Sequence, residues 1–182
     1  MKADCIIGVD PGKAGGIAIG LPDGTIRVAK MPVDMADLRD LLEYYTENYN
    51  AIVFLEKLSL RPDDIRMEDG KPNLGKMYRM QKLIENYAQL KATIEVANVP
   101  YVLVHPLSWQ SKLGLRIAGL KEEKTERKKR YAEYARQLYP YVKVTLWNAD
   151  ALLIMQFGRW VLENDTKWVR ANLPQREHHK IF

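Results

Sequence analysis

Residues 4–20 read DCIIGVDPGKAGGIAIG. An apolar run from Cys5 to Val9 ends in Asp10, glycine-containing turns follow, and a second apolar run begins at Ile17. A continuous apolar run is typical of a strand buried on both faces, and Pro-Gly and Gly-Gly pairs break the chain. The stretch therefore predicts a central strand, a tight turn and an antiparallel return strand. It is not a P-loop, because its Gly-Lys pair lacks the required spacing and the following Ser or Thr.

Asp10 stands where the first strand leaves the sheet. An ionised carboxylate at the end of a buried strand is costly unless a cation or a hydrogen-bond donor compensates its charge. A divalent metal ion would do so, and so would the backbone N–H groups of a turn that the side chain caps. This segment alone leaves both interpretations open.

The following segments predict a mixed sheet. Residues 25–31 alternate after an Asp-Gly turn and predict a third antiparallel strand. A helix is predicted over 34–48, and the apolar run 51–56 then predicts a fourth strand. A strand–helix–strand crossover returns the chain in the same direction, so this strand should run parallel to the first.

Glu56 ends the fourth strand as Asp10 ends the first. If the two strands are neighbours, both carboxylates emerge at one edge of the sheet and repel each other unless a proton or a metal intervenes. The alternative is that Glu56 pairs with Lys57 at a solvated strand end. Together the two acids favour a metal site.

The rest of the chain predicts helices around a fifth strand. Residues 58–76 predict a long loop beside the acids, and a long amphipathic helix over 77–98 is also a candidate dimer interface. A strand over 101–104 precedes a short helix over 108–115, and a further helix ends at Pro140.

The last predicted helix carries Asp150 in its first turn, and its apolar stripe indicates burial. A helix N-terminus favours a carboxylate, so capping is one explanation of Asp150. Gly158, near the end of this helix, indicates close packing against the sheet.

The composition indicates one domain. A chain of 182 residues with 47% hydrophobic content can bury one core, which we expect in residues 1–163, followed by a basic C-terminal tail over 164–182. The single Cys5 excludes a disulfide framework, and neither a signal segment nor a membrane-spanning run is evident, so we expect a cytoplasmic protein. The net charge of +5 permits a polyanionic partner. Basic residues concentrate over 121–130, where a solvated helix face is the alternative to nucleic-acid binding.

Three acids at the end of a first strand, the end of a fourth strand and the start of a last helix resemble the RNase H-like nuclease fold. Within it the chain is similar to the RuvC-type Holliday junction resolvases, particularly their phage-borne relatives. The resemblance implies an α/β fold with a mixed five-stranded sheet, three antiparallel strands first and then two parallel ones, flanked by helices. The stretches that carry it span residues 5–160 in order: Ile7–Gly12, Val53–Glu56, Val99–Trp109, Lys124–Pro140 and Asn148–Ile154.

By this resemblance Asp10, Glu56 and Asp150 are the catalytic, metal-binding acids. The family usually places a fourth acid or a histidine about one turn before the Asp150 equivalent, where this chain has Trp147. Because Trp cannot bind a hard cation, either the amide oxygen of Asn148 or a water would complete the shell. The implied cofactor is Mg²⁺, with Mn²⁺ as a substitute and two ions per site.

The resemblance further implies an endodeoxyribonuclease that resolves four-way junctions by paired nicking and leaves 5′-phosphate and 3′-hydroxyl ends. Two opposed cuts imply a homodimer. Candidate DNA contacts are the basic residues Lys121, Lys124, Arg127 and Lys128. The alternatives are a non-catalytic module that binds branched DNA and an RNase H-like nuclease with broader substrates, including RNA–DNA hybrids.

Overall fold

The computed structural model describes residues 3–12, 14–59, 71–117, 119 and 122–174. Its five strands form one mixed sheet in the order β3-β2-β1-β4-β5. Their bounds are β1 Cys5–Asp10, β2 Gly16–Gly20, β3 Ile26–Lys30, β4 Ala51–Glu56 and β5 Tyr101–Val104. Strands β1, β2 and β3 pair antiparallel, whereas β4 pairs parallel with both β1 and β5. The predicted fold class and the neighbouring position of the first and fourth strands are therefore confirmed.

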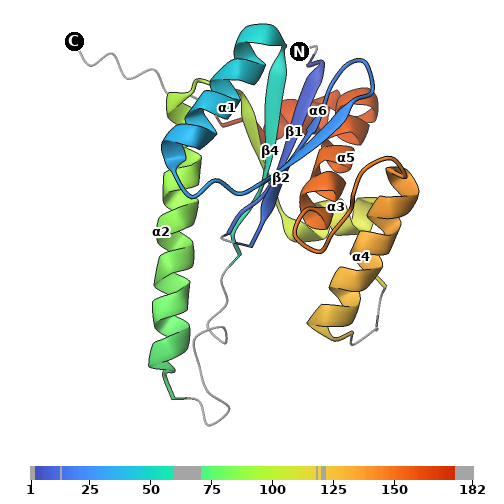
Figure 1. Ribbon diagram of the computed structural model, residues 1–182. Helices are drawn as coiled ribbons and strands as arrows, with labels where there is room; N and C mark the ends of the chain where they lie inside the picture. Colours follow the sequence, from blue (N-terminus) through green and yellow to red (C-terminus); the bar gives the residue numbers. More distant parts are fainter. Residues whose placement is uncertain (1–2, 13, 60–70, 118, 120–121, 175–182) are drawn as a thin grey trace, which may run out of the picture.

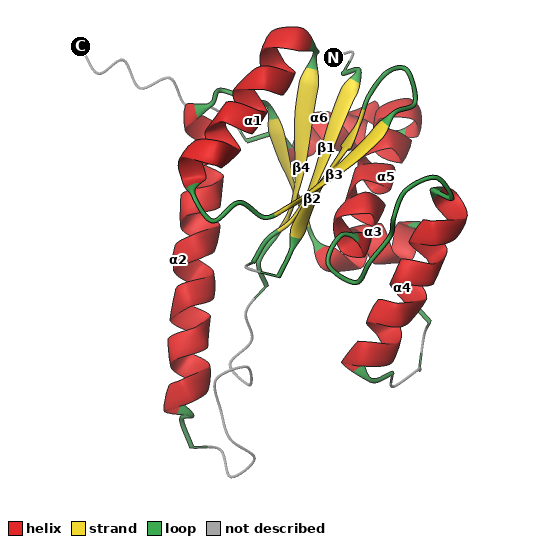
Figure 2. Ribbon diagram, in the orientation of Figure 1, coloured by secondary structure: helices red, strands yellow, loops and turns green. Residues whose placement is uncertain are grey.

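Helices cover both faces of the sheet and make three layers (Figures 1 and 2). One face carries α1 and α2, and the other carries α3 to α6. Each face has its own apolar core, because β1, β2 and β4 are buried on both sides. The helices are α1 Met35–Asn48, α2 Leu74–Val96, α3 Pro106–Lys112, α4 Lys124–Leu138, α5 Ala149–Asn164 and α6 Thr166–Asn172.

Helix α5 lies very close to the centre of the sheet. A side chain at Gly8 of β1 would collide with the Ala151 carbonyl oxygen and with the backbone nitrogen of Met155. A side chain at Gly158 would likewise meet the ring of Phe54 in β4, at 2.5 Å. The close packing predicted from Gly158 is confirmed, and Gly8 supplies a second contact of the same kind.

Two helices begin earlier than their apolar patterns predicted. Helix α2 begins at Leu74, because the Asn73 side chain accepts a hydrogen bond of 2.9 Å from the Lys76 N–H and caps it. Helix α3 begins at Pro106, whose fixed φ suits a first helical position. Of the predicted loop over 58–76, residues 60–70 lie outside the described part of the chain.

The predicted basic tail contains a further helix. Within it, α6 packs on α5: Val169 is buried, and the rings of Trp168 and Phe157 meet edge to face at 5.2 Å. Residues 175–182 lie outside the described part. None of the described helices has the length and apolar character needed to span a bilayer.

Candidate active site

Asp10 leaves β1 at a sharply turned corner of the chain. The turn is closed by the Gly15 N–H, which donates to the Gly12 carbonyl at 2.9 Å. Gly12 has φ +118°, and a side chain at Gly15 would collide with the Asp10 carbonyl oxygen. The glycines that mark this turn in the sequence thus allow β2 to begin directly beside Asp10, in register at Gly16.

Glu56 emerges beside Asp10, because Val9 and Leu55 face each other in the parallel β1–β4 pair. The Trp109 indole N–H of α3 donates a hydrogen bond of 2.9 Å to Glu56 Oε1. Trp109 is 1% exposed. A buried donor therefore fixes the position of Glu56 Oε1, and the second carboxylate oxygen takes no part in that hydrogen bond.

Asp150 reaches the same edge of the sheet from the opposite end of the chain. It lies in the first turn of α5, whose backbone rests on Gly8 of β1. Its side chain is 16% exposed, and Lys128 Nζ of α4 lies 3.8 Å from Asp150 Oδ2. The close contact between α5 and β1 therefore carries Asp150 toward Asp10.

The three acids interact electrostatically with one another. Burial, together with repulsion from Asp150 and Glu56, raises the pKa of Asp10 to about 8. Burial and the charge of Asp150 raise the pKa of Glu56 to about 7, against the opposing effect of the Trp109 hydrogen bond. Burial also raises the pKa of Asp150, although nearby Lys128 lowers it. Each carboxylate thus resists ionisation because it is buried, and for Asp10 and Glu56 the charge of another acid adds to this effect.

The donor set fits a hard divalent cation. Carboxylate oxygens are the ligands that Mg²⁺ prefers, and a cation would remove the repulsion that raises the pKa of Asp10. Over the described residues, however, no group of three or more His, Cys, Asp or Glu side chains is gathered closely enough to form a metal site as it stands. Side-chain rotations would have to bring the three acids together around an ion.

The structure argues against Asn148 as a metal ligand. Its side chain is fully buried, its amide oxygen accepts from the Thr145 N–H at 2.8 Å, and its NH₂ donates to the Lys143 carbonyl at 3.0 Å. Asn148 therefore fixes the turn that leads into α5. Of the two expected ways to complete the shell, an amide oxygen or water, this geometry favours water.

Basic residues of α4 face the acids. Lys124, Arg127 and Lys128 all act electrostatically on Asp150, and the two lysines also act on Asp10. The loop before α4 is held by Arg130, which bonds both oxygens of Glu122 at 3.0 and 2.7 Å. Lys121, the fourth predicted DNA contact, lies outside the described residues.

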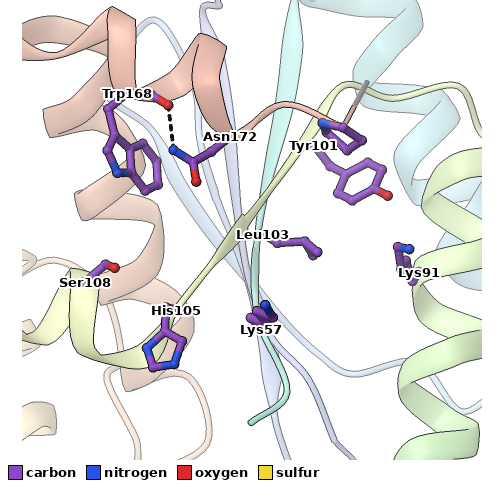
Figure 3. A pocket seen from close by; sticks show the side chains of 9 residues that line it. Lys57, Lys91, Tyr101, Leu103, His105, Ser108, Trp168 and Asn172 are labelled. Carbon is purple, nitrogen blue, oxygen red and sulfur yellow. Dashed lines mark hydrogen bonds between the residues drawn. The ribbon is translucent and has the colours of Figure 1, made fainter. Parts of the chain in front are cut away.

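A separate cavity of about 350 Å³ lies on the outer side of edge strand β5 (Figure 3). His105, Ser108 and Lys57 line it from the ends of β5 and β4 and from α3, and Trp168 and Asn172, which share a hydrogen bond, line it from α6. His105 Nδ1 accepts from the Leu107 N–H at 3.3 Å and so caps α3. None of the three acids lines this cavity, so we assign it no catalytic role.

Trp109 is a residue of the candidate site that sequence patterns did not single out. Its signal is present, because a buried tryptophan needs an acceptor for its indole N–H, and a carboxylate at the end of a neighbouring strand can provide one. Trp109 also packs edge to face on Tyr131 of α4, with ring centroids 5.4 Å apart. It thereby connects α4 to Glu56.

The strand order and the flanking helices define an α/β protein of the RNase H-like fold. Within that fold the structure is similar to RuvC of Thermus thermophilus, solved in complex with a Holliday junction substrate: the TM-score is 0.54 and the identity 14%, over 89% of this chain and 96% of that one. A second RuvC structure from that organism gives a TM-score of 0.51 at 15% identity, over 89% and 97%. The sequence matches no protein-family model and no curated protein. At these identities the similarity establishes the fold.

Proposed function

We propose that the protein is a metal-dependent endonuclease that resolves four-way DNA junctions. One observation carries the proposal: three buried, mutually repelling carboxylates lie at one edge of an RNase H-like sheet, facing the basic side of α4. In such a site the carboxylates can bind a metal ion, and the basic side chains of α4 can bind a phosphate group of the DNA. That pairing suits hydrolysis of a phosphodiester.

Asp10, Glu56 and Asp150 are the proposed ligands for Mg²⁺, or for Mn²⁺ in its place, with two ions per site. Bound metal would activate a water for in-line attack at phosphorus and stabilise the leaving 3′ oxygen, leaving 5′-phosphate and 3′-hydroxyl ends. Both other acids act electrostatically on Asp10, which suits a ligand shared by two ions. Waters and a phosphate oxygen complete the shells.

The protein's other residues orient these groups. Trp109 holds one oxygen of Glu56, so that the carboxylate keeps a single direction. Lys128 and Lys124 lie where they compensate the acids before DNA arrives and contact phosphate afterwards. The Lys128 side chain is 35% exposed and its contact with Asp150 is long, at 3.8 Å, so this exchange costs little free energy.

The choice of a four-way junction rests on the structural similarity to a RuvC bound to that substrate. A junction has two-fold symmetry, and paired nicks require two sites, so the proposed enzyme acts as a homodimer. Helix α2 is the candidate interface, because it exposes Leu74, Met77 and Tyr78. Placement among phage-borne members, acting in the cytoplasm of a bacterium or infected host, rests on sequence resemblance.

A non-catalytic junction-binding protein is the second candidate. It is favoured by Trp147 in place of a fourth ligand and by the acids' failure to gather into a metal site as they stand. The charge distribution suits DNA equally well in both cases. Only cleavage separates the two.

The test compares a labelled four-way junction with a linear duplex, a fork and an RNA–DNA hybrid, in Mg²⁺ and in Mn²⁺. We expect symmetric nicks in the junction alone, and no nicks with Asp10→Asn, which should still bind because binding rests on phosphate neutralisation. Binding without cuts in either metal would establish the second candidate. Cutting of the hybrid would indicate a broader RNase H-like nuclease.

A further inference from the structure

A second cavity lies beside the turn that follows Asp10, and Gly12 and Gly15 of that turn line it. It has a volume of about 650 Å³, within the range of small-ligand sites. Three parts of the chain enclose it: the β1–β2 turn, the connection from β3 to α1, and α2. Trp147 comes from the loop before α5 and completes the wall. We call this cavity the α2 cleft.

Trp147 packs on a row of three residues that face one another across neighbouring strands, namely Asp10 of β1, Gly16 of β2 and Lys30 of β3. Its ring atoms Cε3 and Cζ3 are 2.8 and 3.0 Å from the position that a Gly16 side chain would take, so the indole packs directly on that glycine. Gly16 faces Asp10 across β1–β2 and Lys30 across β2–β3. Two strand spacings, about 10 Å, therefore separate the Asp10 and Lys30 backbones, and the indole lies between them.

The lining of the α2 cleft has the chemistry of a nucleotide site. Met31, Met35 and the Trp147 indole all line it, and their apolar surface suits the flat face of a base. The amides of Asn86 and Gln89 line it from α2 and provide donors and acceptors for the edge of a base.

The positive charge of the α2 cleft suits the phosphate of the same nucleotide. Lys30 and Lys82 both line it. Because Lys82 already pairs with Glu85 at 2.9 Å, we assign the phosphate contact to Lys30, which shares its row with Asp10. One DNA strand can thus place one phosphate at the acids and a neighbouring phosphate at Lys30.

We propose that the α2 cleft binds one unstacked nucleobase next to the phosphodiester at the carboxylates, with the base stacked on Trp147 and its phosphate at Lys30. This inference rests on the proposed function and adds to it a contact with an unpaired base. A base leaves its stack most readily where the duplex is already interrupted. The contact would therefore favour branched over continuous DNA.

The test is a double-mutant cycle between the protein and the DNA. Junctions carrying one abasic residue at each position around the cut are bound to wild type and to Trp147→Leu in EDTA, which prevents cutting. We expect wild type to lose about tenfold in affinity at one position, since stacking a base on an aromatic ring contributes about that much. Trp147→Leu should bind the intact junction about tenfold more weakly and be indifferent to the abasic residue.

Tyr141→Ala is the matched control, because Tyr141 is a fully exposed aromatic residue in the same loop region and lies outside the cleft. It should keep the abasic effect of the wild type. Gln89→Trp repeats the cycle if Trp147→Leu does not fold, because it fills the cleft from an exposed position on α2. It too should remove the abasic effect.

The inference would be overturned if the wild type bound intact and abasic junctions equally well. It would also be overturned if the abasic residue weakened the binding of Trp147→Leu by the same factor as that of the wild type. If wild type nicks both kinds of junction equally, the proposed function stands and only the cleft assignment fails. If wild type neither binds nor nicks any branched DNA, both fail. A Gln89→Trp variant that changes the oligomeric state but keeps the abasic effect would assign the cleft to a second copy of the chain.

Discussion

The two sides of Asp10 each contain a tryptophan, and the two are used in opposite ways. On the β4 side, Trp109 is buried and donates its N–H to Glu56. On the β2 side, Trp147 is half-buried, packs on Gly16 and borders an open cleft. The first acts through one polar atom and the second through the face of its ring. The carboxylate side is therefore sensitive to charge, whereas the cleft side depends on shape and apolar surface.

The largest expected effect is a pH-dependent stability confined to the carboxylate side. A carboxyl whose pKa is higher in the folded than in the unfolded chain keeps its proton only in the folded state between the two values, so stability falls as the pH rises. For Asp10 that interval runs from 3.8 to about 8, and for Glu56 from 4.5 to about 7. Metal-free protein should lose on the order of a few kcal/mol of unfolding free energy between about pH 5 and about pH 9.

Urea unfolding in EDTA across this pH range measures the loss. Asp10→Asn should flatten the profile and be more stable than the wild type at the alkaline end, while saturating Mg²⁺ should restore the wild type. Trp147→Leu, on the cleft side, should keep the slope of the wild type. A wild-type profile that is flat in EDTA would show that the acids do not repel each other as the structure indicates.

A smaller effect compares the same substitution on both sides. Trp109→Phe keeps an aromatic ring but removes the hydrogen bond to Glu56, and losing such a partner of a metal ligand costs about tenfold in metal affinity. The Mg²⁺ concentration for half-maximal nicking should therefore rise about tenfold. Trp147→Phe keeps a stacking surface and should leave the Mg²⁺ titration unchanged. Equal shifts in both variants would remove the distinction between the two tryptophans.

The smallest effect concerns the basic face of α4. Lys128→Ala removes a charge 3.8 Å from Asp150 and one proposed phosphate contact, so junction binding should weaken a few-fold and the salt slope should fall by about 1. Lys129→Ala is the control, because Lys129 pairs with Glu126 at 2.9 Å and is 61% exposed. The measurement is the junction dissociation constant at several salt concentrations. Identical slopes for both variants would mean that α4 does not face the DNA through Lys128.

The sheet was predictable because its strands are marked by local signals. Runs such as Ala51–Glu56 are buried on both faces and therefore almost wholly apolar, and the crossover from β3 through α1 determines the direction of β4. Asp10 and Glu56 follow from those runs directly. Asp150 has no such local signal, since a carboxylate in a first helical turn is commonplace, and it was identified through resemblance.

The remaining features depend on tertiary placement. Asn148 is close to the proposed ligand Asp150 in sequence. Its side-chain amide, however, makes hydrogen bonds with the backbone of Thr145 and Lys143, and no local sequence pattern predicts these bonds. The contact between Trp109 and Glu56 joins residues 53 positions apart. The α2 cleft combines segments from four parts of the chain, so only their packing could show it.

The seating of α5 on Gly8 has a consequence for how the protein is made. Asp10 and Glu56 leave the ribosome early, whereas Asp150 and the rest of α5 follow only after about a hundred further residues have been synthesised. The chain that contains β1 to β4 has two of the three acids and lacks the helix that covers one face of its sheet. An unfinished chain therefore has no complete set of acids, so the proposed cutting activity requires that nearly the whole domain has been synthesised and that the late helix has docked.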